Sequence, residues 1–235
     1  MCSNYIAVTR TDRLLTFFGV ARDPSEPPPE FSAEIWPQRL APFIRRAEDG
    51  SGNRQIEAGQ FGLLPFFAKE LAYGRRTYNA RSETVATLPS FRDAWKRGQR
   101  CIVPAEAIFE PCWETGTAVR WRIQQAGEVP MGIAGVWARH PKLTTKDGKP
   151  MLSFAMLTVN ADGHPVFKRM HRPEDEKRMV VILDPAEYDR WLQCTVAEAA
   201  SFFRQWTGAL DAFPAPLPPR RRQGADEAAE PPDDA

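Results

Sequence analysis

The sequence predicts an α+β protein in which short strands outnumber helices. Most apolar segments alternate with polar residues or form short continuous runs, and only a few have apolar residues at helical spacing. A length of 235 residues suits one large domain or two small ones. A hydrophobic content of 43% is ordinary for a globular protein. We therefore expect a mostly β core with short helices around it.

Strands are predicted throughout the first part of the chain. Residues 4–9 (NYIAVT) alternate polar and apolar side chains, and residues 14–20 (LLTFFGV) predict a second strand after a Thr-Asp-Arg turn. Residues 41–46 predict a short strand. Residues 60–67 (QFGLLPFF) predict an apolar strand that breaks at Pro65 into the pair Phe66 and Phe67.

The rest of the chain repeats this pattern and adds three helices. Further strands are predicted for residues 101–111, 119–124, 131–137, 153–160 and 178–183, with a polar hairpin loop over 141–149. Helical spacing is found in residues 91–97, 185–192 and 196–206. From Phe213 onward Pro, Arg and acidic residues dominate. We expect one domain over residues 2–212 and a disordered tail over 213–235.

Several function classes are disfavoured by composition and motifs. No segment is long and apolar enough for a membrane span, and Arg10, Asp12 and Arg13 interrupt any leader peptide, so a cytoplasmic protein is expected. The four Cys form no CxxC pair, and the three His are not at metal-ligand spacing from them. Nucleotide-binding glycine motifs and the GxSxG motif are missing. We expect neither a metal nor a cofactor.

Charge gives a weaker indication. The net charge is +1, and it becomes +3 without residues 220–235, which hold three Arg and five acidic residues. Some of the remaining basic residues gather in three clusters. These are Arg75, Arg76 and Arg81; Arg92, Lys96, Arg97 and Arg100; and Lys168, Arg169 and Arg172. A cleft lined by such clusters would suit a phosphate backbone, although ordinary solvated charges explain them equally well.

The N-terminus offers unusual chemistry. Removal of Met1 is expected because Cys2 is small, and it would leave an α-amine and a thiol on the same residue. An α-amine titrates near pH ~8 and a free thiol near ~8.5, so both have nucleophilic fractions at neutral pH. Together they can convert an aldehyde to a thiazolidine. The alternative is an irrelevant frayed end, but a strand beginning at residue 4 would anchor Cys2.

Three polar residues inside the chain are further candidates. Asn79 and Arg81 lie two residues apart, so in an extended segment both point to the same side and can bind phosphate or sugar. Glu110 follows the apolar run 107–109, where partial desolvation would suit it to acid–base chemistry. The structural alternatives are a strand-end cap, a surface Arg and an exposed Glu.

Two histidines and two aromatic residues complete the set. His164 and His171 lie in a basic loop before the strand 178–183, and a loop His held by strands is a reasonable catalytic candidate. A lone His is more often structural, and the two compete for one role. Phe66 and Phe67 are core residues by default, but in a nucleic-acid cleft they could stack on bases.

Together these residues resemble the SOS response-associated peptidase (SRAP) family of abasic-site-processing proteins over most of residues 2–206. The resemblance is carried by Met1-Cys2, by residues 79–83 (NARSE), by residues 100–105 (RCIVPA) running to Phe109-Glu110, and by His171 ahead of residues 178–183 (RMVVIL). It implies a single α+β domain with a partly closed, barrel-like, mostly antiparallel β core. It also implies a positively charged cleft for single-stranded DNA.

The resemblance also implies roles for individual residues. Cys2 would bond covalently to abasic sites, Asn79 and Arg81 would hold the sugar and its phosphates, and Glu110 and His171 would move protons. Phe66 and Phe67 stand near the family's DNA-contacting aromatics. The expected product is a thiazolidine crosslink that protects the lesion during the DNA damage response, formed by a monomer.

This sequence also departs from the family pattern. Many members begin Cys-Gly-Arg, whereas here Ser3 and Asn4 follow Cys2, so a phosphate contact from that Arg is lost. The His usually lies nearer its Arg-Met partner, which keeps His164 open as an alternative to His171. Two other functions stay open. One is an N-terminal-nucleophile cysteine peptidase or amidohydrolase, including self-removal of Met1, and the other is a single-stranded DNA-binding module without chemistry. Lyase-type chemistry is expected only as part of the crosslinking activity itself.

Overall fold

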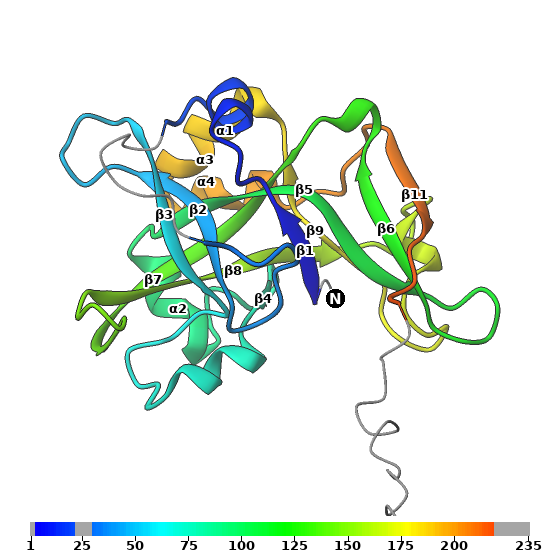
Figure 1. Cartoon of the computed structure of the whole chain (residues 1–235), viewed down its shortest axis with the longest axis horizontal. Helices are drawn as coiled ribbons and strands as arrows, with labels where there is room; N and C mark the ends of the chain where they lie inside the picture. The colour runs from blue at the N-terminus through cyan, green and yellow to red at the C-terminus, as the bar shows by residue number, and fades with distance from the viewer. Residues whose placement is uncertain (1–2, 22–29, 219–235) are drawn as a thin grey trace, which may run out of the picture.

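The computed structural model describes residues 3–21 and 30–218, which form a single α+β domain around a closed five-stranded β-barrel. The barrel strands are β2 (Leu40–Arg46), β3 (Arg54–Phe61), β5 (Arg100–Cys112), β7 (Met131–Thr144) and β8 (Pro150–Asn160). They pair in the ring β2–β3–β8–β7–β5–β2, in which only β3 and β8 are parallel. Figure 1 shows β2 and β3 crossing over β7 and β8. The predicted barrel-like, mostly antiparallel core is confirmed, and its ring is complete.

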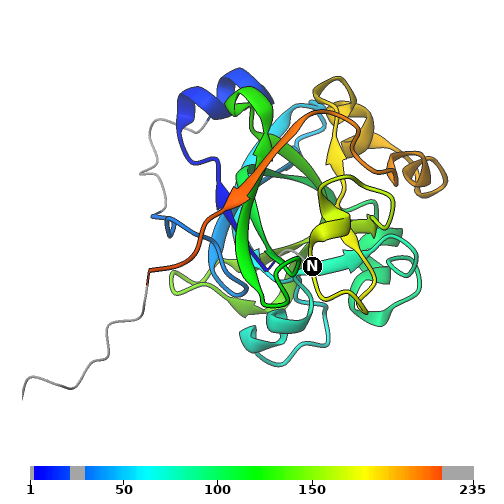
Figure 2. The same cartoon turned by 90° about the vertical axis from the view of Figure 1, so that its right-hand side faces the viewer.

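Strand β5 is long enough to take part in a second sheet outside the barrel. Its first half pairs with β7, and its second half pairs with β1 (Asn4–Ala7) and β6 (Val119–Gln125). Strand β11 (Leu210–Pro214) continues this sheet beyond β6, as Figure 2 shows. The end of β5 that carries Glu110 therefore lies outside the barrel, next to the beginning of the described chain.

Short strands lie on both sides of the end of β8. Strand β4 (Asn79–Arg81) runs parallel to β8, with Arg81 opposite Thr158. Strand β9 (Arg178–Val180) is antiparallel to β8, with Val180 opposite the same Thr158. β10 (Ile182–Leu183) then pairs with β7. This arrangement places Asn79 and Arg81 near the loop that leads from His171 into β9.

Aromatic side chains fill the barrel. Phe154 packs against Phe43 and Phe61 with ring centroids 5.4 and 5.6 Å apart, and all three side chains are completely buried. Burial of a Phe side chain contributes about 1.5–3 kcal/mol relative to exposure. The rigid core that results holds the strand ends, where the polar candidates lie.

The strand predicted for residues 14–20 is wrong, because helix α1 (Thr11–Phe18) occupies most of it. Leu14 and Phe18 lie one helical turn apart and are buried, whereas Leu15 is exposed. Gly19 ends the helix in the left-handed region at φ 65°, where glycine carries little strain. The apolar run was thus compatible with either secondary structure.

The other helices are short. Among the residues described, they are α2 (Pro89–Lys96), α3 (Tyr188–Gln193), α4 (Val196–Ala199) and five 3₁₀ turns, η1 (Leu71–Arg76), η2 (Ala126–Glu128), η3 (Phe167–Arg169), η4 (Pro185–Glu187) and η5 (Ala200–Phe202). The first two predicted helices are confirmed within a few residues. The helix predicted for residues 196–206 is shorter, since α4 continues only into η5 and ends at Phe202. The helices of the described part are too short to span a bilayer.

Three predicted boundaries differ from the structure. Strand β3 ends at Phe61 because Gly62 adopts φ 117°, so Phe66 and Phe67 lie in a turn rather than a strand. The hairpin loop predicted over 141–149 is shorter, because β7 extends to Thr144. Phe213 and Pro214 pair with Arg122 and Trp121 in the outer sheet, so strand pairing runs two residues past the predicted domain boundary. The tail over 219–235 lies outside the described residues.

Candidate functional site

Glu110 and His171, 61 residues apart in the sequence, meet at the end of β5. The Nε2 atom of His171 lies 3.2 Å from Oε2 of Glu110. The Glu110 side chain is 1% exposed and that of His171 is 11% exposed. A carboxylate and an imidazole in contact, with water largely excluded, form an arrangement that can pass a proton to or from a small ligand.

The backbone around His171 fixes the direction of its ring. His171 has φ 62°, which is uncommon for a residue other than glycine. Its N–H donates to the carbonyl of Pro111 at 2.7 Å, and the neighbouring Met170 forms a bridge with Cys112. The ammonium group of Lys177 donates to the carbonyls of His171 and Arg172. These bonds compensate the strained conformation and attach the loop to the strand that carries Glu110.

His164 has a structural environment instead. Its Nδ1 atom accepts the N–H groups of Val166 and Phe167 at 3.1 and 3.2 Å. Its Nε2 atom lies 3.0 Å from the carbonyl oxygen of Trp206 and must donate there, which assigns the neutral Nε2–H tautomer. Burial lowers the pKa of His164. This ring therefore holds the start of η3 and a distant loop together, and His171 is the histidine placed beside Glu110.

Strand β1 brings the N-terminal region to the same place. Asn4 lies opposite Phe109, the residue before Glu110. The Asn4 side chain is buried and donates to Glu34 at 2.9 Å, and Glu34 also accepts from Arg120 at 2.7 Å. Asn4 thus anchors the strand. Cys2 lies outside the described residues.

Asn79 and Arg81 lie on β4, with the buried Ala80 between them. The strand geometry puts both side chains on one face, as the sequence predicted. Arg81 donates to Glu176 at 2.7 Å, and Glu176 lies in the loop between His171 and β9. One loop therefore connects the Glu110 end of the site to the Arg81 end.

A second arginine stabilises this corner. Arg178 is 2% exposed, and its guanidinium donates to both carboxylate oxygens of Glu83 at 2.9 Å and to Glu176 at 2.6 Å. It also donates to the carbonyl of Thr158 at 2.8 Å. The pKa of Glu83 is lowered chiefly by its hydrogen bonds from Arg178, and that of Glu176 for the same reason. Both carboxylates are therefore ionised at neutral pH.

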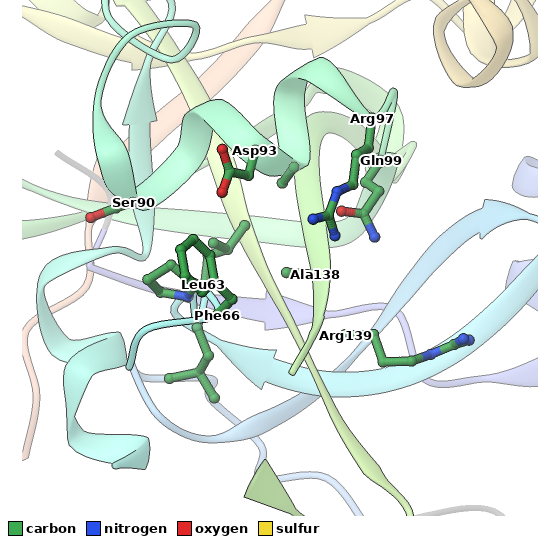
Figure 3. Close-up of a pocket in the computed structure, with 11 residues that line it drawn as sticks. Leu63, Phe66, Ser90, Asp93, Arg97, Gln99, Ala138 and Arg139 are labelled. Atoms are coloured by element: carbon green, nitrogen blue, oxygen red, sulfur yellow. The ribbon is translucent and has the colours of Figure 1, made fainter. Parts of the chain in front are cut away.

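Phe66 and Phe67 are exposed rather than core residues. Their side chains are 56% and 40% exposed, and their rings meet edge to face at 5.3 Å. Phe66 lines a small pocket between α2 and β7, where Figure 3 shows it beside Leu63, with Arg97 and Gln99 just past the C-terminal end of α2. The residues that line this pocket do not include Glu110 or His171. Exposed rings beside a basic residue can bind an unpaired base.

The predicted basic clusters are only partly available to a ligand. Arg100 is buried between Trp95 and Trp191, with its guanidinium carbon 4.5 and 5.4 Å from the ring centroids, so it does not belong to a surface cluster. Arg169 donates to both carboxylate oxygens of Glu114 at 2.8 and 2.6 Å. By contrast, Arg172 is exposed and lies over the ring of Trp113 at 5.0 Å.

The internal cysteines have no evident part in this site. Cys101 is fully buried, and burial raises the pKa of its thiol well above the ordinary value. Cys194 is half-buried and accepts from Arg100 at 3.1 Å. Within residues 3–21 and 30–218, no group of three His, Cys, Asp or Glu side chains is placed to hold a metal ion.

Sequence reasoning missed Glu176, Arg178 and Glu83 as members of one network. Residues 174–178 read as an ordinary run of mixed charges, EDEKR. Glu83 belonged to the segment that carries Asn79 and Arg81, but its partner is 95 residues away. The pairing depends on β4 and β9 both lying against Thr158, which no local pattern shows.

Comparison with known proteins gives a consistent result. A family model described as SOS response associated peptidase (SRAP) matches residues 1–215. The Bacillus subtilis protein called abasic site processing protein YoqW is 28% identical over 196 residues, which cover 82% of this chain and 80% of that protein. A second B. subtilis protein, abasic site processing protein YoaM, is 27% identical over 195 residues, covering 82% and 79%.

Solved structures agree on the fold. A protein of Bordetella bronchiseptica has a TM-score of 0.81 at 36% identity, covering 92% of this chain and all of that one. A protein of Bacteroides thetaiotaomicron has a TM-score of 0.72 at 22% identity, covering 91% of each chain. The second likeness concerns the fold alone.

Proposed function

Because the chain belongs to the SOS response associated peptidase (SRAP) family, we propose that it captures abasic sites in single-stranded DNA through a covalent bond to Cys2. Support comes from the names of its B. subtilis relatives, abasic site processing proteins, and from the site described above. The observation that carries the proposal is the buried contact between Glu110 and His171 beside the first strand of the chain.

The proposal requires the nucleophiles of Cys2 to act beside this pair. Asn4 lies opposite Phe109, the residue before Glu110. Two residues of chain span at most about 7 Å, so the proposal requires the chain to turn toward Glu110 over that short length. Two nucleophilic atoms on one such residue share a single placement, which is the condition under which proximity accelerates a reaction most.

The proposed reaction begins with the open-chain aldehyde of an abasic sugar. After Met1 is removed, the α-amine of Cys2 attacks C1′, and the carbinolamine loses water to give an imine. The Cys2 thiol then adds to the imine carbon, and its proton passes to the nitrogen as the thiazolidine ring closes. The overall change is the loss of one water molecule and the formation of C–N and C–S bonds.

Glu110 and His171 would move the protons in this sequence. Opening of the sugar ring needs a proton on the ring oxygen and removal of the proton from the C1′ hydroxyl. Loss of water from the carbinolamine needs a proton on the leaving hydroxyl. A carboxyl and an imidazole in contact can perform both tasks from one side of the sugar. Asn79 and Arg81 would hold the sugar and its phosphates from β4.

Intact mass measurement tests the proposal. The purified protein, lacking Met1, is incubated with a single strand that carries one abasic site. The expected adduct weighs as much as protein plus DNA minus one water. Cys2→Ala should give no stable adduct, and an adduct that survives this change would exclude the assignment.

Cys2→Ser separates the two bonds. This variant keeps the amine but loses the sulfur, so it should form an imine that borohydride traps and that dissociates without reduction. A strand with a tetrahydrofuran analogue has no aldehyde and should give no adduct with any variant.

The peptidase named in the family's description would use the same residue in another way. A Cys2 thiol could attack an acyl carbon with the α-amine as base. Adding Ala before Cys2 blocks both reactions and leaves simple DNA binding intact. Assays on abasic DNA and on a panel of separate peptides then distinguish the two activities. Only a hydrolase would cleave the added peptides, and only the crosslinking protein would form an adduct with the DNA.

A further inference from the structure

A single carboxylate, that of Glu176, bridges two arginines at the edge of the candidate site. Its Oε2 atom lies 2.7 Å from Nη1 of Arg81, and its Oε1 atom lies 2.6 Å from Nη1 of Arg178. The two arginines reach Glu176 from opposite sides of β8, since Arg81 lies on β4 and Arg178 lies on β9.

The two arginines differ in their need for this carboxylate. Arg178 is buried and also holds both oxygens of Glu83 and the carbonyl of Thr158, so most of its donors keep partners without Glu176. Arg81 is 47% exposed at its side chain, and Glu176 is 36% exposed. The contact between Arg81 and Glu176 is therefore the one that an incoming ligand can reach.

The chemistry of the contact matches that of a nucleic-acid phosphate. A guanidinium binds carboxylate and phosphate oxygens with the same donors and similar geometry. The pKa of Glu176 is lowered, chiefly by hydrogen bonding to Arg178, so it is an anion at neutral pH. In the free protein an anionic oxygen of the chain itself thus occupies the place on Arg81 where a phosphate oxygen would bind.

We propose that Glu176 is an internal competitor for DNA phosphate at Arg81, and that it limits affinity for strands that engage nothing else in the site. This inference rests on the proposed function. A phosphate must displace Glu176 from Arg81, and the displaced carboxylate keeps its bond to Arg178. A contact between the DNA backbone and Arg81 alone therefore adds little affinity. To bind well, a strand needs a further contact, such as that of its abasic sugar with Glu110 and His171.

The same loop carries both the competitor and His171, and its bonds permit this movement. His171 is held by the carbonyl of Pro111 and by Lys177, and neither contact involves Glu176. The release of Arg81 therefore leaves the contact between His171 and Glu110 in place.

The test measures binding of a single strand with a tetrahydrofuran abasic analogue, which cannot react with Cys2. Glu176→Gln removes the competing charge, and Glu174→Gln is the matched control. Glu174 is exposed in the same loop, and no ion pair to it is found among the described residues. Because exposed ion pairs contribute about 0.2–1 kcal/mol, Glu176→Gln is expected to bind about 1.4- to fivefold more tightly than Glu174→Gln.

The assignment to Arg81 is tested in a second background. In Arg81→Met the competitor has nothing to block, so adding Glu176→Gln should raise affinity for the strand no more than adding Glu174→Gln does. In the protein that keeps Arg81, equal affinities of Glu176→Gln and Glu174→Gln, or weaker binding by Glu176→Gln, would overturn the proposal.

A measurement on the wild-type protein tests the same displacement without relying on the stability of the Glu176→Gln variant. With arginine labelled by ¹⁵N, the Nε–H resonance of Arg81 should shift when the strand binds, while that of Arg178 stays nearly unchanged. An Arg81 resonance that does not move at saturation would contradict displacement. Failure of the proposed function looks different, because then the wild-type protein forms no adduct with abasic DNA.

Discussion

The imidazole of His171 lies 3.2 Å from the carboxylate of Glu110, and both side chains are almost completely shielded from water. His171→Ala should therefore slow adduct formation on an abasic strand by about 100-fold or more, the usual range for losing a general acid or base. Binding of the unreactive tetrahydrofuran strand should weaken by a much smaller factor than the rate, because only one contact to the sugar is lost. Initial rates from quenched time points, read by intact mass, give the comparison.

The control for this change is His164→Ala, assayed at a temperature where the variant is folded. His164 binds backbone groups of η3 and Trp206, so its loss should slow the reaction only slightly. Equal slowing by the two substitutions would remove His171 from the proton-transfer role.

His164 makes a separate prediction about pH and stability. Burial lowers its pKa below the unfolded value of 6.5, so below about pH 6.5 the unfolded chain binds more protons than the folded one. The stability that depends on neutral His164 is present above pH 6.5 and is lost as pH falls toward the folded pKa. In the wild type, the urea concentration at the unfolding midpoint should therefore decrease as the pH is lowered from about 7.5 to 5.5.

His164→Asn should flatten this part of the profile, because it removes the titrating group. Carboxylates with lowered pKa, such as Glu83 and Glu176, lose their stabilising charge only in more acidic solution, below about pH 4.5. A decline between pH 7.5 and 5.5 that is as steep in His164→Asn as in the wild type would show that another group is responsible.

The sequence was sufficient for the strands whose pattern is unambiguous. The apolar run that ends at Glu110 predicted a buried strand, and the structure places that run in β5. The run 14–20 was misassigned because Leu14 and Phe18 satisfy helical spacing as well as an apolar strand does. In the structure, the left-handed conformation of Gly19 marks the end of helix α1. The sequence shows only that residue 19 is glycine, and glycine fits the end of a strand equally well.

The site was predictable residue by residue but not as an arrangement. Asn79 and Arg81 share a face because of strand geometry, which the sequence alone implies. The contact between His171 and Glu110 depends instead on a bond from the His171 N–H to the Pro111 carbonyl and on a left-handed backbone at a non-glycine residue. Neither feature has a local sequence signal, which is why His164 stayed open as an alternative to His171.

The close approach of Gly62 and Gly74 predicts a sharp effect on stability. A Cβ atom on Gly62 would lie 2.2 Å from the carbonyl oxygen of Gly74, and Gly62 has φ 117°. Gly62→Ala should therefore lower the free energy of unfolding by about 3 kcal/mol or more, since strain and a backbone clash add. Gly163→Ala is the control, because a Cβ there meets nothing within 4 Å. Urea denaturation that places both variants within about 0.5 kcal/mol of each other would contradict the predicted clash.

The exposed rings of Phe66 and Phe67 give the remaining prediction. If they stack on unpaired bases, each change to Ala should weaken binding of single-stranded DNA about tenfold, since stacking of one base contributes about 1–3 kcal/mol. Phe213→Ala is the matched control, because that ring is 43% exposed on β11, in the outer sheet. All three variants should keep nearly the wild-type unfolding midpoint, as exposed side chains contribute little to the core. Fluorescence anisotropy with a labelled strand measures the affinities. Unchanged affinity in Phe66→Ala and Phe67→Ala would leave this pair to pack against Tyr73 and the pocket beside α2, with no part in binding DNA.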